Sequence, residues 1–296
     1  SDDGEPKTLT LKRDIIKVKS VKFEEKMLAG ADTEDKDAPK VGYVRISDFG
    51  VTTARELEDA LKKLEKKNVV GYVLDVRNNP GGYLMAAIDV ADAFLDDGEI
   101  VSTRGKRKTD IERMFAKEGD MVNGKPVVVL INHGSASASE IVAGALQDNG
   151  RGLVMGSQSF GKGSVQQQKP LGDGTAIHIT IARYYTPSGN SIQNEGITPD
   201  VEVLQSKLEV LEKKESMYSE ASFKNSLKND KSKKKKDKKS SDDSDDEEET
   251  PYEELTDEEK DARDYQLQRA MDMVIAMSKL QNRTQVSEEK TESDKE

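Results

Sequence analysis

Three serines at alternate positions stand at the expected start of a helix, and their type and placement suit nucleophilic chemistry. Ser135, Ser137 and Ser139 follow the apolar run 126–131 and precede a helical pattern. A serine hydroxyl attacks a carbonyl group when a nearby base takes its proton. Serines at a helix start are also favoured caps for the free N–H groups of the first turn. This segment alone leaves a nucleophile and a set of caps as open alternatives.

A lysine between two glycines is the strongest candidate for the base. Lys162 lies beside Phe160 in the segment 159–163, and burial there would favour the neutral amine and make it a base near neutral pH. Gln166, four positions further on, is suited to orienting that amine through a hydrogen bond. The same segment, taken alone, also fits a solvated loop lysine.

Two other kinds of site are weaker candidates. A Ser-His-Asp arrangement would need His133 or His178 to be held by a carboxylate. The segment 156–162 imitates a phosphate-binding loop, but Gly163 follows the lysine where that loop needs Ser or Thr, and a strand pattern follows where it needs a helix. With no Cys and two His in the chain, a zinc-type metal site is disfavoured.

Strand, turn and helix patterns alternate along the chain and predict how these residues are positioned. Apolar runs at 69–76 and 126–131 each lead through a polar, glycine-containing turn into a pattern with helical spacing. Such succession predicts right-handed crossovers and a largely parallel sheet, with both turns at its carboxyl edge. Short alternating strands between 152 and 183 make the predicted class mixed α/β, with flanking helices and short antiparallel strands.

The charge distribution divides the chain into unlike parts. The net charge is −11, yet about a quarter of residues 41–205 are charged, as in ordinary globular proteins, against about half of residues 206–296. The Lys-rich and acidic blocks between 206 and 255 predict a disordered linker. Thr256 and Glu259 form a capping-box pattern before an amphipathic helix expected over 256–282, and 283–296 is expected to be disordered.

The composition also excludes several classes of protein. No apolar run is long enough to span a membrane, and the acidic body has no basic, aromatic-rich stripe for nucleic acid. The sequence begins without Met and without a signal-peptide pattern, which suggests a trimmed or expressed fragment whose targeting segment is already gone.

Five motifs, in order, resemble those of the carboxyl-terminal processing peptidases, also called tail-specific proteases. They are DVRNNPGG at 75–82, GSASASEI at 134–141, FGKG at 160–163, ARYYTPSG at 182–189 and GITPD at 196–200. The resemblance covers roughly residues 8–205 and implies a serine endopeptidase that cleaves proteins near their carboxyl termini, without metal or cofactor. It implies that Ser137 is the nucleophile, Lys162 the general base and Gln166 the residue that positions the lysine. Gly82 and Ala138 match the positions whose backbone N–H groups form the oxyanion hole.

The resemblance also implies a domain organisation and a compartment. Residues 1–40 are expected to be a remnant of a PDZ domain with a linker, and 41–205 the protease core. The expected partners are proteins or peptides that present a carboxyl terminus. Bacterial members are usually exported, so a periplasmic or cell-envelope location is expected, with the signal segment outside this chain.

Two other functions remain alternatives to proteolysis. The first is a catalytically silent peptide-binding or scaffold module on the same fold. The second is an interaction protein that works through the charged tail and the terminal helix, which would also offer a surface for a homo-oligomer.

Overall fold

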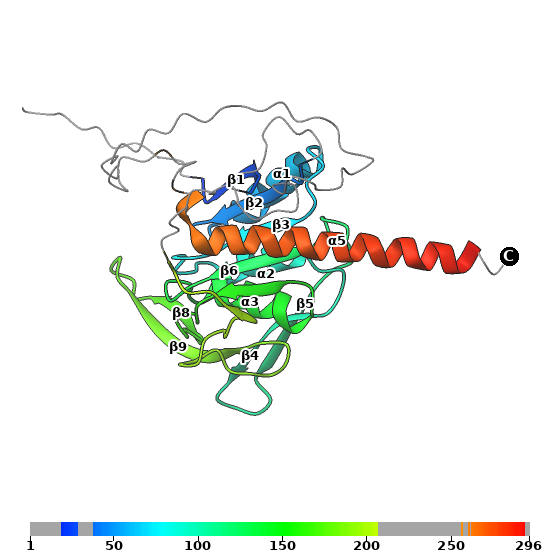
Figure 1. Cartoon of the computed structure of the whole chain (residues 1–296). Helices are drawn as coiled ribbons and strands as arrows, with labels where there is room; N and C mark the ends of the chain where they lie inside the picture. Colours follow the sequence, from blue (N-terminus) through cyan, green and yellow to red (C-terminus); the bar gives the residue numbers. More distant parts are fainter. Residues whose placement is uncertain (1–18, 29–37, 207–255, 257–259, 261, 294–296) are drawn as a thin grey trace, which may run out of the picture. The chain divides into compact units, whose positions relative to one another are not determined.

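The computed structural model describes residues 19–28, 38–206, 256, 260 and 262–293 (Figure 1). The chain divides into a unit of Ser1–Gln205 with Gln266–Glu296, described below, and a unit of Ser206–Tyr265. Most of that second unit, including the charged linker expected over 206–255, lies outside the described residues. The terminal segment 294–296 and residues 1–18, where a strand was expected near 8–18, also lie outside them.

A six-stranded sheet of mostly parallel strands forms the centre of the first unit. In spatial order its strands are β1 (Val21–Lys26), β2 (Val41–Ile46), β3 (Tyr72–Asp75), β6 (Val127–Ile131), β7 (Leu153–Gly156) and β10 (Val201–Glu202). Only β1 runs antiparallel to its neighbour, and the other pairs are parallel. β3 and β6 are buried along their whole length, as expected of strands covered on both faces. The largely parallel sheet predicted from the apolar runs is confirmed.

Three helices connect the parallel strands and cover the sheet. They are α1 (Thr53–Glu65), α2 (Leu84–Asp92) and α3 (Ala138–Asp148). α1 buries the apolar face that its sequence spacing predicts, with Leu57, Ala60, Leu61 and Leu64 all fully inaccessible. Burial of this stripe against the sheet stabilises α1, because about 2 kcal/mol comes from each fully buried leucine. α2 and α3 lie side by side, so the two turns that precede them are brought together.

A second, antiparallel sheet has the strand order β5, β4, β9 and β8. These strands span Ile111–Phe115, Glu99–Gly105, Ala176–Tyr185 and Ser164–Pro170, respectively. β4 pairs with β9 only between Ala182 and Tyr185, and the rest of β9 pairs with β8 alone. The alternation of isoleucines in β9 predicted the strand correctly, but it marks no buried face, since Ile177, Ile179 and Ile181 are 42–49% exposed.

The terminal helix packs on the first unit. α5 spans Tyr265–Ser293, so it begins and ends later than the helix expected over 256–282. Its apolar face includes Leu267, Ala270, Met271 and Val274, which are fully buried. Of the expected capping box, Glu259 lies outside the described residues. No helix in the described part of the chain is long and apolar enough to cross a membrane.

The core sheet begins before residue 41, where the protease core was expected to start. β1 lies within the segment 1–40 and pairs along its whole length with β2, from Val21 opposite Ile46 to Lys26 opposite Val41. Ser20, just before β1, also accepts a backbone hydrogen bond from Ser47. At least the last part of the segment 1–40 is therefore built into the sheet.

Candidate active site

Two strand-to-helix turns meet at the carboxyl edge of the parallel sheet. β3 and β6 are hydrogen-bonded neighbours, so the turns 76–83 and 132–137 that follow them lie next to each other. Asn78 and Asn132 join the turns through two hydrogen bonds of 2.9 and 3.0 Å. The backbone N–H of Ala136 donates to the carbonyl oxygen of Asn79 at 3.0 Å. The sequence-based expectation that both turns share one edge therefore holds.

Ser137 has a backbone conformation that sets it apart from the serines beside it. It lies immediately before α3 with φ 55° and ψ −109°, a region that non-glycine residues rarely occupy. Such strain costs on the order of 1–3 kcal/mol and is concentrated at functional positions, including nucleophiles on sharp strand-to-helix turns. Ser137 is also half-buried, so its side chain is accessible from outside.

The neighbouring serines have structural partners. Ser135 and Ser139 are fully buried. The Ser135 hydroxyl donates to the carbonyl oxygen of Val76 at 2.8 Å, and the Ser139 hydroxyl donates to that of Asn79 at 2.9 Å. Both serines therefore hold the two turns together.

A buried carboxylate binds the Ser137 turn and the Lys162 loop at once. Glu140, in the first turn of α3, is fully buried. Its Oε2 accepts hydrogen bonds from the backbone N–H groups of Ser137 at 2.7 Å and Lys162 at 2.9 Å. Its Oε1 accepts from the Ser159 hydroxyl and the Gly161 N–H, each at 2.6 Å. One oxygen atom thus holds the backbones of the two residues proposed for nucleophile and base.

Glu140 was not among the site residues predicted from the sequence. A signal for it exists, because Glu140 follows Ser137 by three positions, which is the capping-box spacing. The backbone N–H of Ser137 indeed donates to the Glu140 side chain. The three other donors come from a loop about twenty residues away in sequence, so the spacing alone could not have revealed them.

The Lys162 side chain is exposed, which corrects the expectation that burial favours its neutral form. Phe160, the aromatic residue expected to cover it, is itself 67% exposed. The structure shows no hydrogen bond between Nζ of Lys162 and Oγ of Ser137, both of which are described. The backbone N–H groups of Lys162 and Ser137 are therefore held by the same carboxylate oxygen, while the Lys162 side chain is exposed.

The structure shows no hydrogen bond between Gln166 and the Lys162 amine, both of which are described. Gln166 lies on β8, is exposed, and is paired across the hairpin with Thr180 after an irregularity between Val165 and Gln166. Its proposed role of positioning the lysine has no hydrogen bond to support it in this conformation.

The two expected oxyanion donors lie on facing turns. Gly81 has φ +103°, and a Cβ atom added to it would lie 2.9 Å from Cβ of Ser137 and 3.0 Å from the N atom of Ala138. The turn that carries Gly82 therefore packs directly against the start of α3. Within the described part of the chain, neither the N–H of Gly82 nor that of Ala138 donates a hydrogen bond to another protein group. Two unpartnered N–H groups are thus available near Ser137.

A buried cluster of charged side chains lies at the end of β3, the strand that leads into the Gly82 turn. Asp75, the last residue of β3, is fully buried and accepts three hydrogen bonds of 2.7–3.0 Å from Arg77. It also accepts from the Tyr43 hydroxyl at 2.8 Å and from Arg45 at 3.2 Å. Burial by itself would raise the pKa of Asp75, but Arg77 and Arg45 and their hydrogen bonds hold that pKa below its usual value. Burial and the Asp75 carboxylate together raise the pKa of the Tyr43 hydroxyl.

Comparison with known proteins identifies the family of this chain. The model of peptidase family S41 matches residues 40–203, more than half of the chain. A carboxy-terminal-processing protease of Bartonella bacilliformis is 52% identical over 204 residues, which cover 68% of this chain and 44% of the relative. The chain belongs to peptidase family S41. The resemblance inferred from the five motifs is confirmed.

Other S41 relatives agree in sequence and in fold. A carboxyl-terminal-processing protease of Synechocystis sp. is 41% identical over 200 residues, covering 68% of this chain and 45% of the relative. The solved structure of a photosystem II D1 C-terminal processing protease matches with 37% identity and a TM-score of 0.57, over 64% of this chain and 49% of that chain. The mixed α/β class is thereby confirmed. The chain spans about half, or less, of the length of each of these S41 relatives.

The other candidate sites are not supported in this S41 chain. His133 and His178 are both exposed, and the structure shows neither bonded to a carboxylate. Lys162 is followed by the strand β8, where a phosphate-binding loop would need a helix. Among the described residues, no group of three or more His, Asp or Glu side chains is placed to hold a metal ion.

Proposed function

We propose that this chain is a serine endopeptidase that cleaves protein substrates near their carboxyl termini, with Ser137 as nucleophile and Lys162 as general base. The observation that carries the proposal is the shared anchor: Oε2 of Glu140 binds the backbone N–H groups of both residues. The strained conformation of Ser137 and the unpartnered N–H groups of Gly82 and Ala138 support it.

The first half of the reaction forms an acyl-enzyme. The neutral Lys162 amine takes the proton of the Ser137 hydroxyl as Oγ attacks the carbonyl carbon of the scissile peptide bond. The carbonyl oxygen becomes an oxyanion, which accepts hydrogen bonds from the N–H groups of Gly82 and Ala138. One such donor contributes on the order of 10²–10³ in rate. The C–N bond then breaks, and the lysine ammonium gives its proton to the leaving amine.

The second half releases the acyl group and restores the enzyme. A water molecule enters where the amine has left, and Lys162, neutral again, takes one of its protons as the water oxygen attacks the ester carbonyl. Collapse of the second tetrahedral intermediate breaks the bond to Oγ. Ser137 regains its proton from the lysine, and the new carboxyl terminus leaves. The residues named here carry all the proton transfers.

The exposure of Lys162 fits this chemistry if the substrate completes the site. We infer that a bound polypeptide covers the amine and excludes water, which favours the neutral form and moves Nζ toward Oγ. Hydrogen bonds of catalytic groups often form only in the substrate complex. Gln166 is proposed to orient the amine in that state.

The substrate class and compartment are proposed from the family. The matched S41 relatives carry names that describe carboxyl-terminal processing. For this chain we propose protein or peptide substrates with an accessible carboxyl terminus, and a periplasmic or cell-envelope location. We also propose that the segment 1–40 includes the end of a PDZ domain, in addition to β1. Self-association through α5 remains a proposal.

A fluorophosphonate probe separates this proposal from a catalytically silent scaffold. The probe phosphonylates a serine only when the hydroxyl is activated. We expect intact-protein mass spectrometry to show one adduct on the wild-type chain, none on Ser137→Ala, and one on the control Ser191→Ala. Absence of the wild-type adduct at high probe concentration, in protein shown to be folded by circular dichroism, would support the scaffold and contradict the proposed enzyme.

A further inference from the structure

The terminal helix α5 reaches the edge of the sheet that carries the candidate active site. Gln266, in its first turn, is only 3% exposed, and both ends of its amide have partners. Oε1 accepts a hydrogen bond from Nη1 of Arg77 at 3.0 Å, and Nε2 donates to the carbonyl oxygen of Val203 at 2.6 Å. Arg77 follows β3 and Val203 follows β10. The Gln266 side chain therefore bridges two separate segments at the carboxyl edge.

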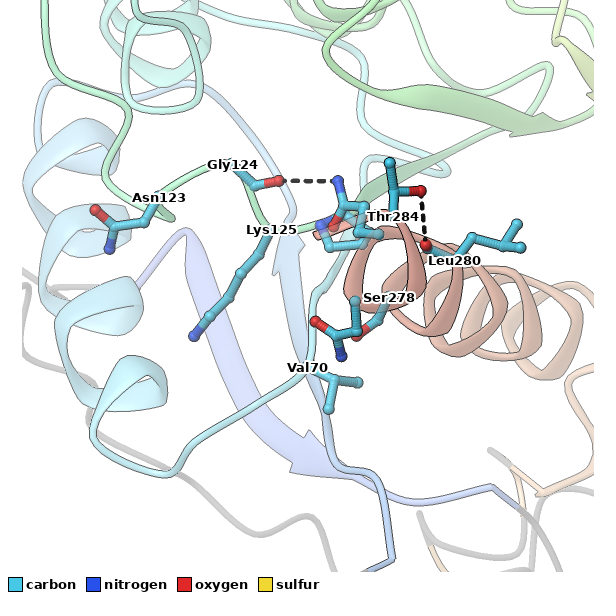
Figure 2. Close-up of a pocket in the computed structure, with 10 residues that line it drawn as sticks. Val70, Asn123, Gly124, Lys125, Ser278, Leu280 and Thr284 are labelled. Atoms are coloured by element: carbon cyan, nitrogen blue, oxygen red, sulfur yellow. Dashed lines mark hydrogen bonds between the residues drawn. The ribbon is translucent and has the colours of Figure 1, made fainter. Parts of the chain in front are cut away.

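The position of Gln266 is fixed by the packing of the helix behind it. The apolar face from Leu267 to Val274 is fully buried, and a Cβ atom on Gly71 would come within 2.6 Å of the Val274 side chain. Further along, Nε2 of Gln281 donates to the carbonyl oxygen of Gly124 at 3.3 Å. Gly124 and Gln281 are among the residues that line a cavity of about 670 Å³, which Figure 2 shows in close-up. Because the apolar face from Leu267 to Val274 is buried, α5 cannot slide or rotate without breaking that packing, and Gln266 is held in register.

Arg77 transmits this restraint to the turn that carries Gly82. Its Nε, Nη2 and backbone N–H groups are bound by Asp75, while Nη1 is directed at Gln266. Asp75 is rigidly held within the sheet, so Asp75 and Gln266 together fix the plane of the guanidinium group. Arg77 also lies at the start of the turn 76–83, and its carbonyl oxygen accepts a hydrogen bond from Arg45 at 3.4 Å. The direction in which this turn leaves β3 is therefore set partly by α5.

We propose that Gln266 is a positioning residue for the reaction proposed above. It fixes Arg77, and through Arg77 the turn that presents the N–H of Gly82 to the oxyanion. The inference rests on the proposed function and makes α5, which lies outside the residues matched by the family model, part of the catalytic unit. Because the oxyanion exists only in the transition state and intermediates, a displaced donor lowers kcat and leaves KM nearly unchanged.

The test compares two Gln-to-Met substitutions on the same helix, in the full chain. Gln266→Met keeps the length of an unbranched side chain and removes both hydrogen bonds, and Gln281→Met removes a bond far from the turn. With unfolded casein as substrate, we expect Gln266→Met to lower kcat about tenfold with KM changed less than about twofold. Gln281→Met is expected to match the wild type. Gln266→Glu keeps an acceptor for Arg77 and is expected to restore most of kcat.

Hydrogen–deuterium exchange measures how firmly the backbone of the Gly82 turn is held, and it does not require an active enzyme. We expect the backbone amides of the segment 77–83 to exchange faster in Gln266→Met than in the wild type or in Gln281→Met. Unchanged exchange in this segment, or an unchanged kcat in Gln266→Met, would overturn the inference. If the wild type shows no Ser137-dependent hydrolysis, the proposed function fails, and the exchange result still decides the positioning. If Gln266→Met does not fold, Gln266→Asn is used in its place. It shortens the side chain, and the same changes in kcat and in amide exchange are expected.

Discussion

At the residue scale, the roles of single side chains follow from their hydrogen-bond partners more than from their type. Among three serines of similar sequence context, the two fully buried ones donate to backbone carbonyl groups, and Ser137 has the strained backbone. The motifs led to the prediction of Ser137 as nucleophile and Lys162 as general base, and both roles remain predictions. The motifs did not identify Glu140, because its partners come from a loop that only the fold brings near. Nor could they show that Lys162 is exposed.

The Asp75 carboxylate is fully buried between two guanidinium groups. We therefore expect its charge to make the stability of the fold depend on pH. Its pKa in the folded chain lies below the unfolded value of about 3.9. The ionised form therefore stabilises the fold above about pH 4, and this contribution is lost as the pH falls below 4 toward the lower, folded pKa. At pH 7, Asp75→Asn leaves Arg77 and Arg45 without their counter-charge and is expected to cost about 3–5 kcal/mol.

The measurement is the free energy of unfolding in urea between pH 2 and pH 7. We expect the gap between wild type and Asp75→Asn to be constant above about pH 5 and to narrow below pH 4. Asp59→Asn, at an exposed position on α1, serves as the matched control and is expected to lie close to the wild type throughout. A gap that stays the same down to pH 2 would contradict the assigned role of the Asp75 charge.

At the element scale, the site depends on how closely two turns approach each other. The sequence predicted both turns and their common edge, because apolar strand patterns followed by helical spacing define parallel crossovers. It did not predict β4 and β5. The strand patterns that it found elsewhere depend on long apolar runs or clean alternation, and Glu99–Gly105 shows neither. The cross-turn bonds between Asn78 and Asn132 also lay beyond prediction, since they join residues 54 positions apart.

Gly81 tests the importance of that close approach. It has φ +103°, and a Cβ atom there would come within 3.0 Å of the Ala136 oxygen, the Ser137 Cβ and the Ala138 nitrogen. Gly81→Ala is therefore expected to push the Gly82 turn away from α3 and to lower kcat/KM at least about a hundredfold. Gly119→Ala is the control for backbone strain alone, because Gly119 has φ +129° with nothing within 4 Å of an added Cβ atom.

Casein hydrolysis and thermal unfolding of both glycine variants give the comparison. Both are expected to lose some stability, since alanine is disfavoured at positive φ. Only Gly81→Ala is expected to lose activity at a temperature where both variants are folded. Equal activity of the two variants would show that the contact between the turns does not matter for the chemistry.

At the scale of the whole molecule, the net charge and the residues proposed for chemistry are concentrated in different parts of the chain. The net charge of −11 arises mainly from the residues beyond 205. The residues proposed for chemistry all lie between 82 and 166, within the range matched by the S41 family. The sequence placed the terminal helix and its apolar face, but the bridge from Gln266 to Arg77 could not be foreseen. Its two ends are 189 positions apart, and no local pattern encodes such a contact.

The central claim is that Lys162 activates Ser137, and one matched pair of lysine variants tests it most directly. Lys162→Ala removes the proposed base. Lys169→Ala removes an exposed lysine from β8, the strand that follows Lys162. The measurement is kcat/KM for casein hydrolysis at neutral pH, with folding checked by circular dichroism. The account predicts a loss of at least about a thousandfold for Lys162→Ala, because the serine hydroxyl then has no base, and no change for Lys169→Ala. Hydrolysis by Lys162→Ala within tenfold of the wild-type rate would contradict it.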